Sequence, residues 1–156
     1  MSNTLPKLSI ITINYNNTRG LEKTLSSVWN DQTYSNFEHI VIDGGSTDGS
    51  VDVIKKYADK LTYWVSEPDK GIYNAMNKGI LKAKGEYLLF LNSGDYLCNE
   101  ALSEIFSENF SEDIVYGNFT LLCKNGEKKI KTFSEQVDYN LLYLESIGHQ
   151  STLIKR

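Results

Sequence analysis

The chain has 156 residues, of which 40% are hydrophobic and 23% are charged, so it can form one domain with a buried core. Its formal net charge of −4 argues against a nucleic-acid partner, because nucleic-acid-binding domains usually carry a basic surplus. The two cysteines, Cys98 and Cys123, are too few and too far apart for a disulfide framework or a four-cysteine zinc site; we expect core thiols and a reducing, cytoplasmic location.

Short apolar segments alternate with amphipathic segments through the first two thirds of the chain. The pattern predicts strands at 8–13, 39–42, 61–65 and 87–91, and helices at 18–30, 50–59, 72–84 and from 99 or 100 to about 106. Thr18 is the expected N-cap of the first helix. The first apolar run is too short for a signal peptide or a membrane span, so we expect no transmembrane segment and allow peripheral association with the inner face of a membrane.

The last third of the chain has a different pattern. Strands are predicted at 114–116, 118–123 and 128–133, the last two joined by a hairpin turn at Asn125-Gly126. A short helix is predicted at 138–145 and a final strand at 151–154. The fold class is therefore α/β: a mostly parallel central sheet flanked by helices, with a small antiparallel section near the C-terminus. No repeat or linker interrupts residues 1–156, which are expected to form one domain.

Polar side chains follow three of the predicted parallel strands. Asn14 and Tyr15 follow the first strand, Asp43 follows the second, and the segment Asn92-Ser-Gly-Asp95 follows the fourth. Each of these segments alone is more typical of an ordinary turn. Because ligands of open parallel sheets bind beyond the carboxyl ends of the strands, their coincidence favours a ligand site at this edge.

The chemistry of these loops points to a nucleotide. Asp43 and the glycines after it suit a nucleoside, although the segment is neither a Walker loop nor a GxGxxG fingerprint. Lys70 precedes a predicted helix start, which suits a pyrophosphate; the alternative is that Asp69 caps this helix and Lys70 is solvated. Asp95 offers a carboxylate for a divalent cation whose other ligands are substrate phosphates, but an aspartate in a glycine turn is common.

The two histidines differ in their surroundings. His39 lies inside a predicted buried strand and is expected to be structural. His149 lies in the polar segment Ile147-Gly-His-Gln-Ser-Thr152, between apolar stretches. It suits a ligand or metal contact, and a hydrogen-bonded structural histidine fits the pattern equally well.

Taken in order, the motifs resemble those of the family 2 inverting glycosyltransferases, in particular the bacterial branch that builds cell-surface polysaccharides. The resemblance extends from Leu8 to about Lys155. The matching segments are Leu8-Ser-Ile-Ile-Thr-Ile-Asn-Tyr-Asn-Asn17, Ser26-Ser-Val-Trp-Asn-Asp-Gln-Thr33, Val41-Ile-Asp-Gly-Gly-Ser-Thr-Asp-Gly-Ser50, Gly71-Ile-Tyr-Asn-Ala-Met-Asn-Lys-Gly-Ile80 and Gly85-Glu-Tyr-Leu-Leu-Phe-Leu-Asn-Ser-Gly-Asp95.

This resemblance implies the GT-A fold, a nucleoside-diphosphate sugar donor linked to UDP or GDP, Mg²⁺ or Mn²⁺, and transfer with inversion to a saccharide or lipid-linked acceptor. It implies a metal contact at Asp95. The residues that it implies for donor binding are Thr12, Asn14 and Tyr15 at the nucleoside, Asp43 at the base or ribose, Lys70 at the diphosphate, Asn92 in the acidic loop, and His149 near the donor sugar.

The chain departs from the family pattern at three points. Gly44 stands where the family usually has a second acid. The loop Asn92-Ser-Gly-Asp95 keeps one acid of the usual Asp-x-Asp-Asp. The family places its general base downstream of the His-Gln segment, so we expect it beyond Arg156, name no catalytic residue, and expect a donor-binding portion truncated before the acceptor segment.

Two other classes of protein compete with a transferase. A non-catalytic module that binds a nucleotide sugar or a protein partner would explain both the depleted acidic loop and the missing base. A nucleotidyltransferase also combines an α/β sheet, a nucleotide and a metal. It would be expected to have a glycine-rich first loop followed by Arg and Lys, which the segment from Asn14 to Arg19 does not match.

Overall fold

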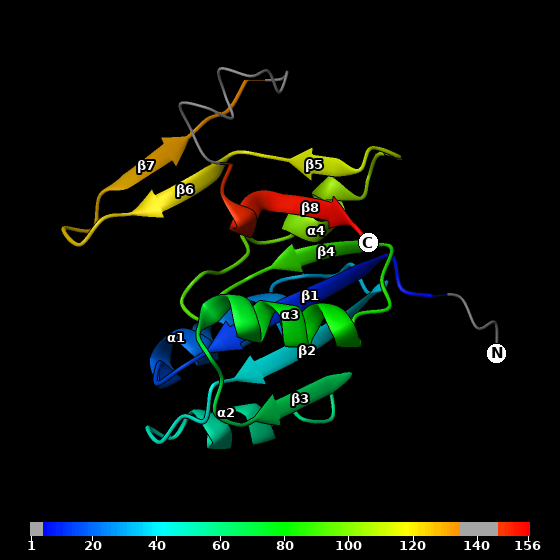
Figure 1. Ribbon diagram of the computed structural model, residues 1–156. Helices are drawn as coiled ribbons and strands as arrows, with labels where there is room; N and C mark the ends of the chain where they lie inside the picture. The colour runs from blue at the N-terminus through cyan, green and yellow to red at the C-terminus, as the bar shows by residue number, and fades with distance from the viewer. Residues whose placement is uncertain (1–4, 135–146) are drawn as a thin grey trace.

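The computed structural model of the protein describes residues 5–134 and 147–156 (Figure 1). The predicted helix at 138–145 lies outside these residues. The elements are β1 (Leu8–Asn14), α1 (Thr18–Trp29), β2 (Phe37–Asp43), α2 (Ser50–Lys56), β3 (Tyr63–Ser66), α3 (Ile72–Lys82), β4 (Tyr87–Phe90), α4 (Ala101–Ile105), β5 (Ile114–Tyr116), β6 (Phe119–Leu122), β7 (Lys128–Lys131), the 3-10 helix η1 (His149–Ser151) and β8 (Thr152–Lys155).

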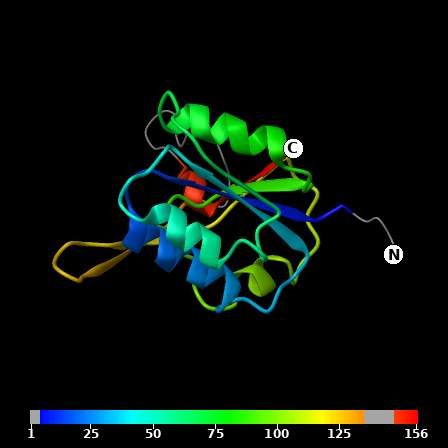
Figure 2. The same cartoon turned by 90° about the horizontal axis from the view of Figure 1, so that it is seen from below.

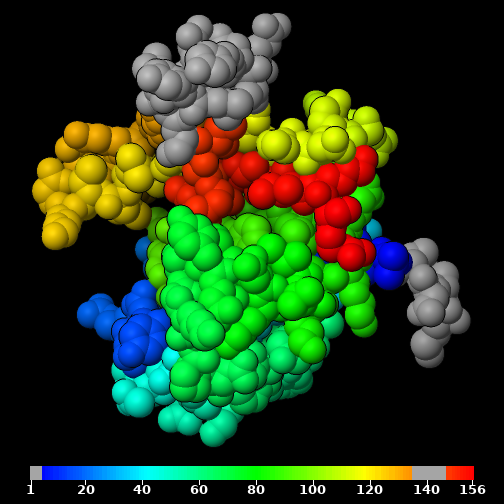
Figure 3. Space-filling model, viewed as in Figure 1, coloured from blue at the N-terminus to red at the C-terminus, as the bar shows by residue number. Residues whose placement is uncertain are grey.

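The central sheet has six strands in the order β3-β2-β1-β4-β8-β5. Strands β1 to β4 are parallel, and β8 is antiparallel to both of its neighbours. A separate antiparallel hairpin, β6–β7, extends from the body at the end of the sheet toward which the parallel strands run (Figures 1 and 3). The predicted α/β class, with a mostly parallel sheet and a small antiparallel section, is confirmed.

Helices cover both faces of the sheet, with α3 on one face and α1, α2 and α4 on the other (Figure 2). The apolar residues of β1 alternate between these faces. Ile11 and Ile13 pack with Ala75 of α3, whereas Leu8 and Ile10 pack on the opposite face with Val28 of α1. Both faces of β1 are covered, which is why this strand is buried at every position.

The N-cap of the first helix lies one residue earlier in the sequence than predicted. Asn17, rather than Thr18, is the N-cap, and its side-chain oxygen accepts from the N–H of Gly20 at 3.1 Å. Thr18 is the first helical residue, and its hydroxyl donates to the carbonyl of Asp48 at 2.9 Å. The prediction of Thr18 as N-cap was wrong because Asn17 is an equally good cap and Thr18 has a partner in the loop after β2.

His39 is buried, whereas the two cysteine side chains are not. His39 is fully buried, lies 2.9 Å from the Thr12 hydroxyl through Nε2, and stacks on Trp29, which confirms its structural role. The core positions predicted for the thiols were wrong: Cys98 is exposed and Cys123 is partly exposed. Among residues 5–134 and 147–156, no helix is long and apolar enough to cross a membrane.

Candidate functional site

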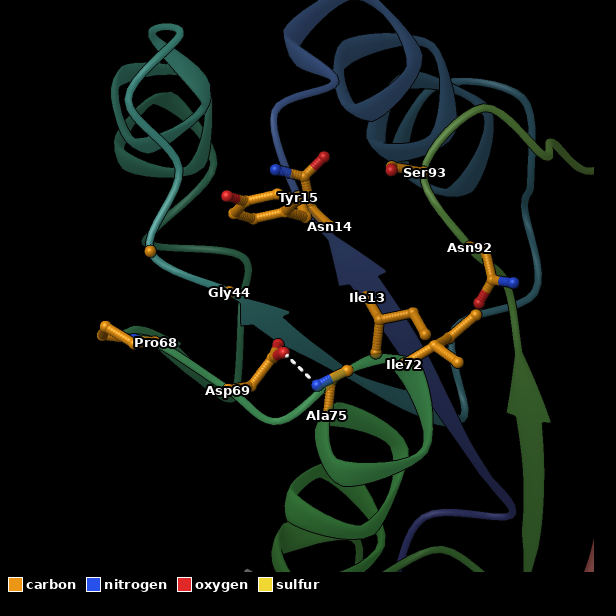
Figure 4. Close-up of a pocket in the computed structure, with 12 residues that line it drawn as sticks. Ile13, Asn14, Tyr15, Gly44, Pro68, Asp69, Ile72, Ala75, Asn92 and Ser93 are labelled. Atoms are coloured by element: carbon orange, nitrogen blue, oxygen red, sulfur yellow. Dashed lines mark hydrogen bonds between the residues drawn. The ribbon is translucent and has the colours of Figure 1, made fainter.

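A cavity of about 680 Å³ opens at the carboxyl ends of the parallel strands (Figure 4). It lies between the ends of β1, β2 and β4 and the loop that leads into α3. This is the edge of the sheet that the sequence predicts for a ligand. Its lining residues are Ile13, Asn14, Tyr15, Gly44, Gly45, Pro68, Asp69, Gly71, Ile72, Ala75, Asn92 and Ser93.

The ends of β1 and β2 are joined by a buried polar pair. Asn14 lies opposite Asp43 in the sheet and donates through Nδ2 to Asp43 Oδ1 at 2.7 Å. Asp43 also accepts from the Ser46 N–H, the Ser46 hydroxyl and the Ser66 hydroxyl, at 2.6 to 2.8 Å. Both carboxylate oxygens are therefore occupied, and Asp43 is 0% exposed.

Two opposing effects act on the pKa of Asp43. Burial by itself raises the pKa, but the hydrogen bonds from Ser46, Ser66 and Asn14 together outweigh burial and lower it. The carboxylate is thus ionised and satisfied by protein groups. Asn14 is left with a buried side-chain oxygen that has no hydrogen-bond partner among the described residues.

One wall of the cavity combines an aromatic ring with a carboxylate. Tyr15 is 66% exposed and lies beside Gly44, across from Asp69 (Figure 4). Asp69 Oδ1 accepts from the N–H of Gly71 at 2.8 Å, which closes a turn just before α3. Gly71 is the N-cap, so the alternative in which Asp69 caps this helix was wrong. The chain passes through Gly71 with φ of 102°, which favours glycine, and α3 begins without a side-chain cap on Gly71.

The start of α3 forms another part of the wall. Gly71 and Ile72 line the cavity, so the N-terminus of this eleven-residue helix faces it. Backbone N–H groups at a helix N-terminus attract anions such as phosphate. Lys70 lies between the lining residues Asp69 and Gly71; it is exposed, and its side chain is not part of the wall.

The opposite wall comes from the segment after β4. The side-chain amide nitrogen of Asn92 lies 2.9 Å from His149 Nε2, and the buried side-chain oxygen of Asn92 has no partner within residues 5–134 and 147–156. In Figure 4 this oxygen points into the cavity and the nitrogen points away. His149 therefore contacts the cavity wall through Asn92, from a position outside the lining.

Asp95 lies behind this wall, three residues after Asn92. Burial raises the pKa of its carboxyl group, and the nearby His149 lowers it to a smaller extent. The loop is held by Thr24 of α1, whose hydroxyl donates to the Asp95 carbonyl at 2.6 Å and accepts from the Gly94 N–H at 2.9 Å. Thr24 was not among the predicted site residues, and a polar residue among the buried positions of α1 is the signal that could have indicated it.

The residues after β4 offer a cation few ligands. In the described ranges no three His, Cys, Asp or Glu side chains cluster as a metal site would require. A half-buried carboxylate at Asp95 and the unpartnered oxygen of Asn92 are oxygen donors of the kind that Mg²⁺ and Mn²⁺ accept. These residues fit a cation that takes its remaining oxygens from phosphates or water.

Only some of the predicted site residues line the cavity. Asn14, Tyr15 and Asn92 line the cavity. The other predicted residues lie around it: Thr12 and Asp43 are buried behind the wall, Lys70 is exposed beside it, and His149 and Asp95 lie beyond Asn92. Asp69, which the sequence offered as a helix cap, is a lining residue that no prediction assigned to a ligand.

Comparison with known proteins identifies the family. The model of a family described as glycosyl transferase family 2 matches residues 9–144. The chain belongs to this family, as its motifs predicted.

Relatives with curated names are glycosyltransferases. A protein named uncharacterized glycosyltransferase in Mycobacterium tuberculosis is 47% identical over 90 residues, which are 58% of this chain and 34% of that protein. Another of that description in Haemophilus influenzae is 33% identical over 159 aligned positions, covering 97% of this chain and 63% of that protein. A PGL/p-HBAD biosynthesis glycosyltransferase of M. tuberculosis is 31% identical, covering 97% and 60%. The chain thus spans between a third and two thirds of these relatives.

Solved structures show the same fold. The S. aureus protein TarS, residues 1–349 in complex with UDP-GlcNAc, superimposes with a TM-score of 0.58 and 29% identity over 65% of this chain and 30% of that chain. The mannosyltransferase of Pyrobaculum calidifontis, in complex with GDP-Man and Mn²⁺, gives a TM-score of 0.52 and 25% identity over 59% and 28%. The predicted GT-A fold is confirmed.

Proposed function

We propose that this chain is the donor-binding domain of a glycosyltransferase that transfers a sugar, with inversion, from a UDP- or GDP-linked donor. The acceptor is a saccharide or a lipid-linked acceptor in the synthesis of a bacterial cell-surface polysaccharide. The observation that carries the proposal is the cavity at the carboxyl ends of β1, β2 and β4, beside the start of α3, in a member of this family. The ligands named for TarS and for the mannosyltransferase support this choice of donor.

The two ends of the cavity suit the two parts of such a donor. The exposed ring of Tyr15 and the carboxylate of Asp69 suit a nucleoside, which offers a flat base and several N–H and O–H donors. A diphosphate is repelled by a carboxylate and fits better toward Asn92 and Ser93. The N–H groups at the start of α3 lie between these ends.

A divalent cation, Mg²⁺ or Mn²⁺, is proposed at the diphosphate end. Asp95 would hold it, with the side-chain oxygen of Asn92 as a second ligand. When bound, the cation would stabilise the negative charge that develops on the leaving nucleoside diphosphate. The Mn²⁺ named for the mannosyltransferase structure is consistent with this proposal.

The remaining steps depend on residues that we do not assign. An inverting transfer requires a base that takes the proton of the acceptor hydroxyl, and we expect it outside residues 1–156. A cytoplasmic location and association with the inner face of a membrane also stay predictions. Donor binding is therefore the part of the proposed function that this chain can be tested for on its own.

One observation favours a second candidate function. The segment Asn92–Asp95 contains one carboxylate, and in the described part of the chain no three His, Cys, Asp or Glu side chains form a group that could hold a metal ion. A module that binds a nucleotide sugar without transferring it would need no strong cation site. The two candidates differ in whether nucleotide binding depends on a metal.

The test is calorimetric titration with UDP and GDP, with and without Mn²⁺, on the wild type and on Asp95→Ala. We expect binding of at least one nucleotide, strengthened by Mn²⁺ in the wild type and much less so in Asp95→Ala. The matched control is Asp59→Asn, at an exposed position after α2, which is expected to bind like the wild type.

Each outcome has a distinct meaning. Binding that is independent of Mn²⁺ and unchanged in Asp95→Ala would contradict the cation site and favour the non-catalytic module. Failure of the wild type to bind either nucleotide would remove the donor-binding proposal itself. If binding is confirmed, a chain extended by its downstream sequence can be assayed for donor hydrolysis and transfer.

A further inference from the structure

The cavity wall has one carboxylate in the part of the chain that the structure describes, and it belongs to Asp69. Asp43, the acid at the end of β2, is fully buried and its oxygens are occupied by Asn14, Ser46 and Ser66. Asp69 Oδ1 accepts from the Gly71 N–H, whereas its Oδ2 has no partner among the described residues. Asp69 thus has an acceptor free for a ligand, and Asp43 does not.

The position of this carboxylate depends on Gly44. A Cβ atom added to Gly44 would lie 2.8 Å from Asp69 Oδ2 and 3.2 Å from the ring of Tyr15, so the space beside Gly44 is filled by these two side chains. The backbone at Gly44 does not have the positive φ found at Gly45, so its conformation does not require glycine. A side chain at position 44 would therefore displace the Asp69 carboxylate from its present position.

We propose that Asp69 is the residue that recognises the nucleoside of the donor, by accepting hydrogen bonds from an N–H of the base or a hydroxyl of the ribose. Asp43 is a positioning residue that orients Asn14 and the loop after β2. The inference rests on the proposed function and deepens it. Its basis is the free oxygen of Asp69, directed toward the cavity beside the exposed ring of Tyr15 (Figure 4).

The alternative explanation is that Asp69 only stabilises the turn before α3, through its hydrogen bond from the Gly71 N–H. Asn at this position keeps an oxygen for the Gly71 N–H but removes the charge and one acceptor. Asp69→Asn therefore distinguishes the two roles, because it keeps the hydrogen bond in the turn and weakens the contact with the ligand. Asp69→Ala removes both, and Asp59→Asn serves as the control for the loss of a surface charge.

The first experiment is calorimetry with UDP, GDP, 2′-deoxy-UDP and inorganic pyrophosphate, each with Mg²⁺. We expect Asp69→Asn to weaken the nucleoside diphosphate that the wild type binds by about tenfold to a hundredfold, the range for a hydrogen bond to a charged group. Pyrophosphate, which has no nucleoside, should bind as well as before or more tightly. A smaller loss with 2′-deoxy-UDP than with UDP identifies the ribose 2′-hydroxyl as the contact, and an equal loss identifies the base or the 3′-hydroxyl.

The second experiment moves the carboxylate to the other side of the contact. Gly44→Asp alone should weaken nucleotide binding, because the new side chain displaces Asp69. In the Asp69→Ala background the space is vacant, and Gly44→Asp should restore part of the lost affinity. This opposite sign of one substitution in two backgrounds is not expected of a residue that only shapes the turn.

Two results would overturn the inference. One is an Asp69→Asn variant that binds nucleotides like the wild type. The other is an Asp69→Asn variant that binds nucleotides and pyrophosphate more tightly by the same factor, since the carboxylate would then face the diphosphate. If the double variant does not fold, as judged by thermal melting, Asp69→Asn alone decides. A wild type that binds no nucleotide contradicts the proposed function instead.

Discussion

At the scale of single residues, the buried carboxylate of Asp43 does not line the cavity but accepts a hydrogen bond from Asn14, which does. A buried charge is stable only when hydrogen bonds replace its water, and Asp43 receives four of them from three residues. The sequence places an acid at the end of β2, but it does not predict that both carboxylate oxygens accept hydrogen bonds from the protein. Ser66 comes from β3, 23 positions away, and its contact depends on the pairing of strands.

His39 provides a prediction about stability and pH. Burial lowers its pKa from 6.5 to about 3, so the folded chain keeps it neutral in a range where the unfolded chain takes up a proton. The unfolded state binds more protons between these two values, and stability therefore falls as the pH falls through this range. The loss from this group should be about 1.4 kcal/mol per pH unit well below 6.5.

The measurement is urea denaturation of the wild type and His39→Gln from pH 7.5 to 4.5. Other titrating groups contribute equally to both proteins, so the difference between the two curves isolates His39. We expect the wild type to lose stability more steeply than the variant below pH 6.5. Parallel curves would contradict this prediction, because His39 would then take up a proton as readily in the folded chain as in the unfolded chain.

At the scale of elements, α3 packs against β1 more closely than a side chain would allow at one point. A Cβ atom added to Gly79 would lie 2.4 Å from the Cγ2 atom of Ile11, which is fully buried. Replacing glycine by alanine inside a helix normally stabilises it by about 1 kcal/mol. Here the collision is with a core side chain that has no free space to move into.

We therefore expect Gly79→Ala to destabilise the protein by about 1–3 kcal/mol, the range for an overpacked core. The matched control is Gly117→Ala, where an added Cβ atom meets nothing within 4 Å and the backbone is not left-handed. Chemical denaturation should show little change for Gly117→Ala. A stabilised Gly79→Ala would mean that α3 can move away from β1 at little cost.

The elements themselves were largely predictable, because the buried strands contain short apolar runs and the helices have apolar stripes. The first and last residues of the elements were less predictable. β2 begins at Phe37 rather than at 39, and the cap of α1 is Asn17 rather than Thr18. For the site, adjacent polar loops predicted the right edge of the sheet. The lining position of Asp69 was not predictable, since it depends on how the loop before α3 folds back onto Gly44.

At the scale of the whole molecule, β8 joins the parallel strands to the last part of the sheet. It lies between β4 and β5, and Leu153 on this strand is buried in the same core as Leu8 and Leu89. The sequence predicts the strand but not its neighbours, because strand order depends on contacts between distant segments. The position of β8 makes its inward-facing side chains part of the main core.

Leu153→Ala should therefore destabilise the protein by about 2–5 kcal/mol, as expected for a buried leucine. Ile154, the next residue on the same strand, is 38% exposed and points to the other face. Ile154→Ala should cost clearly less. Equal losses in thermal or chemical denaturation would contradict the burial of β8 between β4 and β5.

The place of β8 also has a consequence for the order in which the chain assembles during its synthesis. β1 to β4 are complete by residue 90, and they pair with one another in parallel. β5 follows at residues 114–116, yet its neighbour in the sheet is β8, whose last residue is 155. A nascent chain can pair its first four strands as they leave the ribosome, but it must keep β5 unpaired for about 40 further residues, which take a few seconds to synthesise.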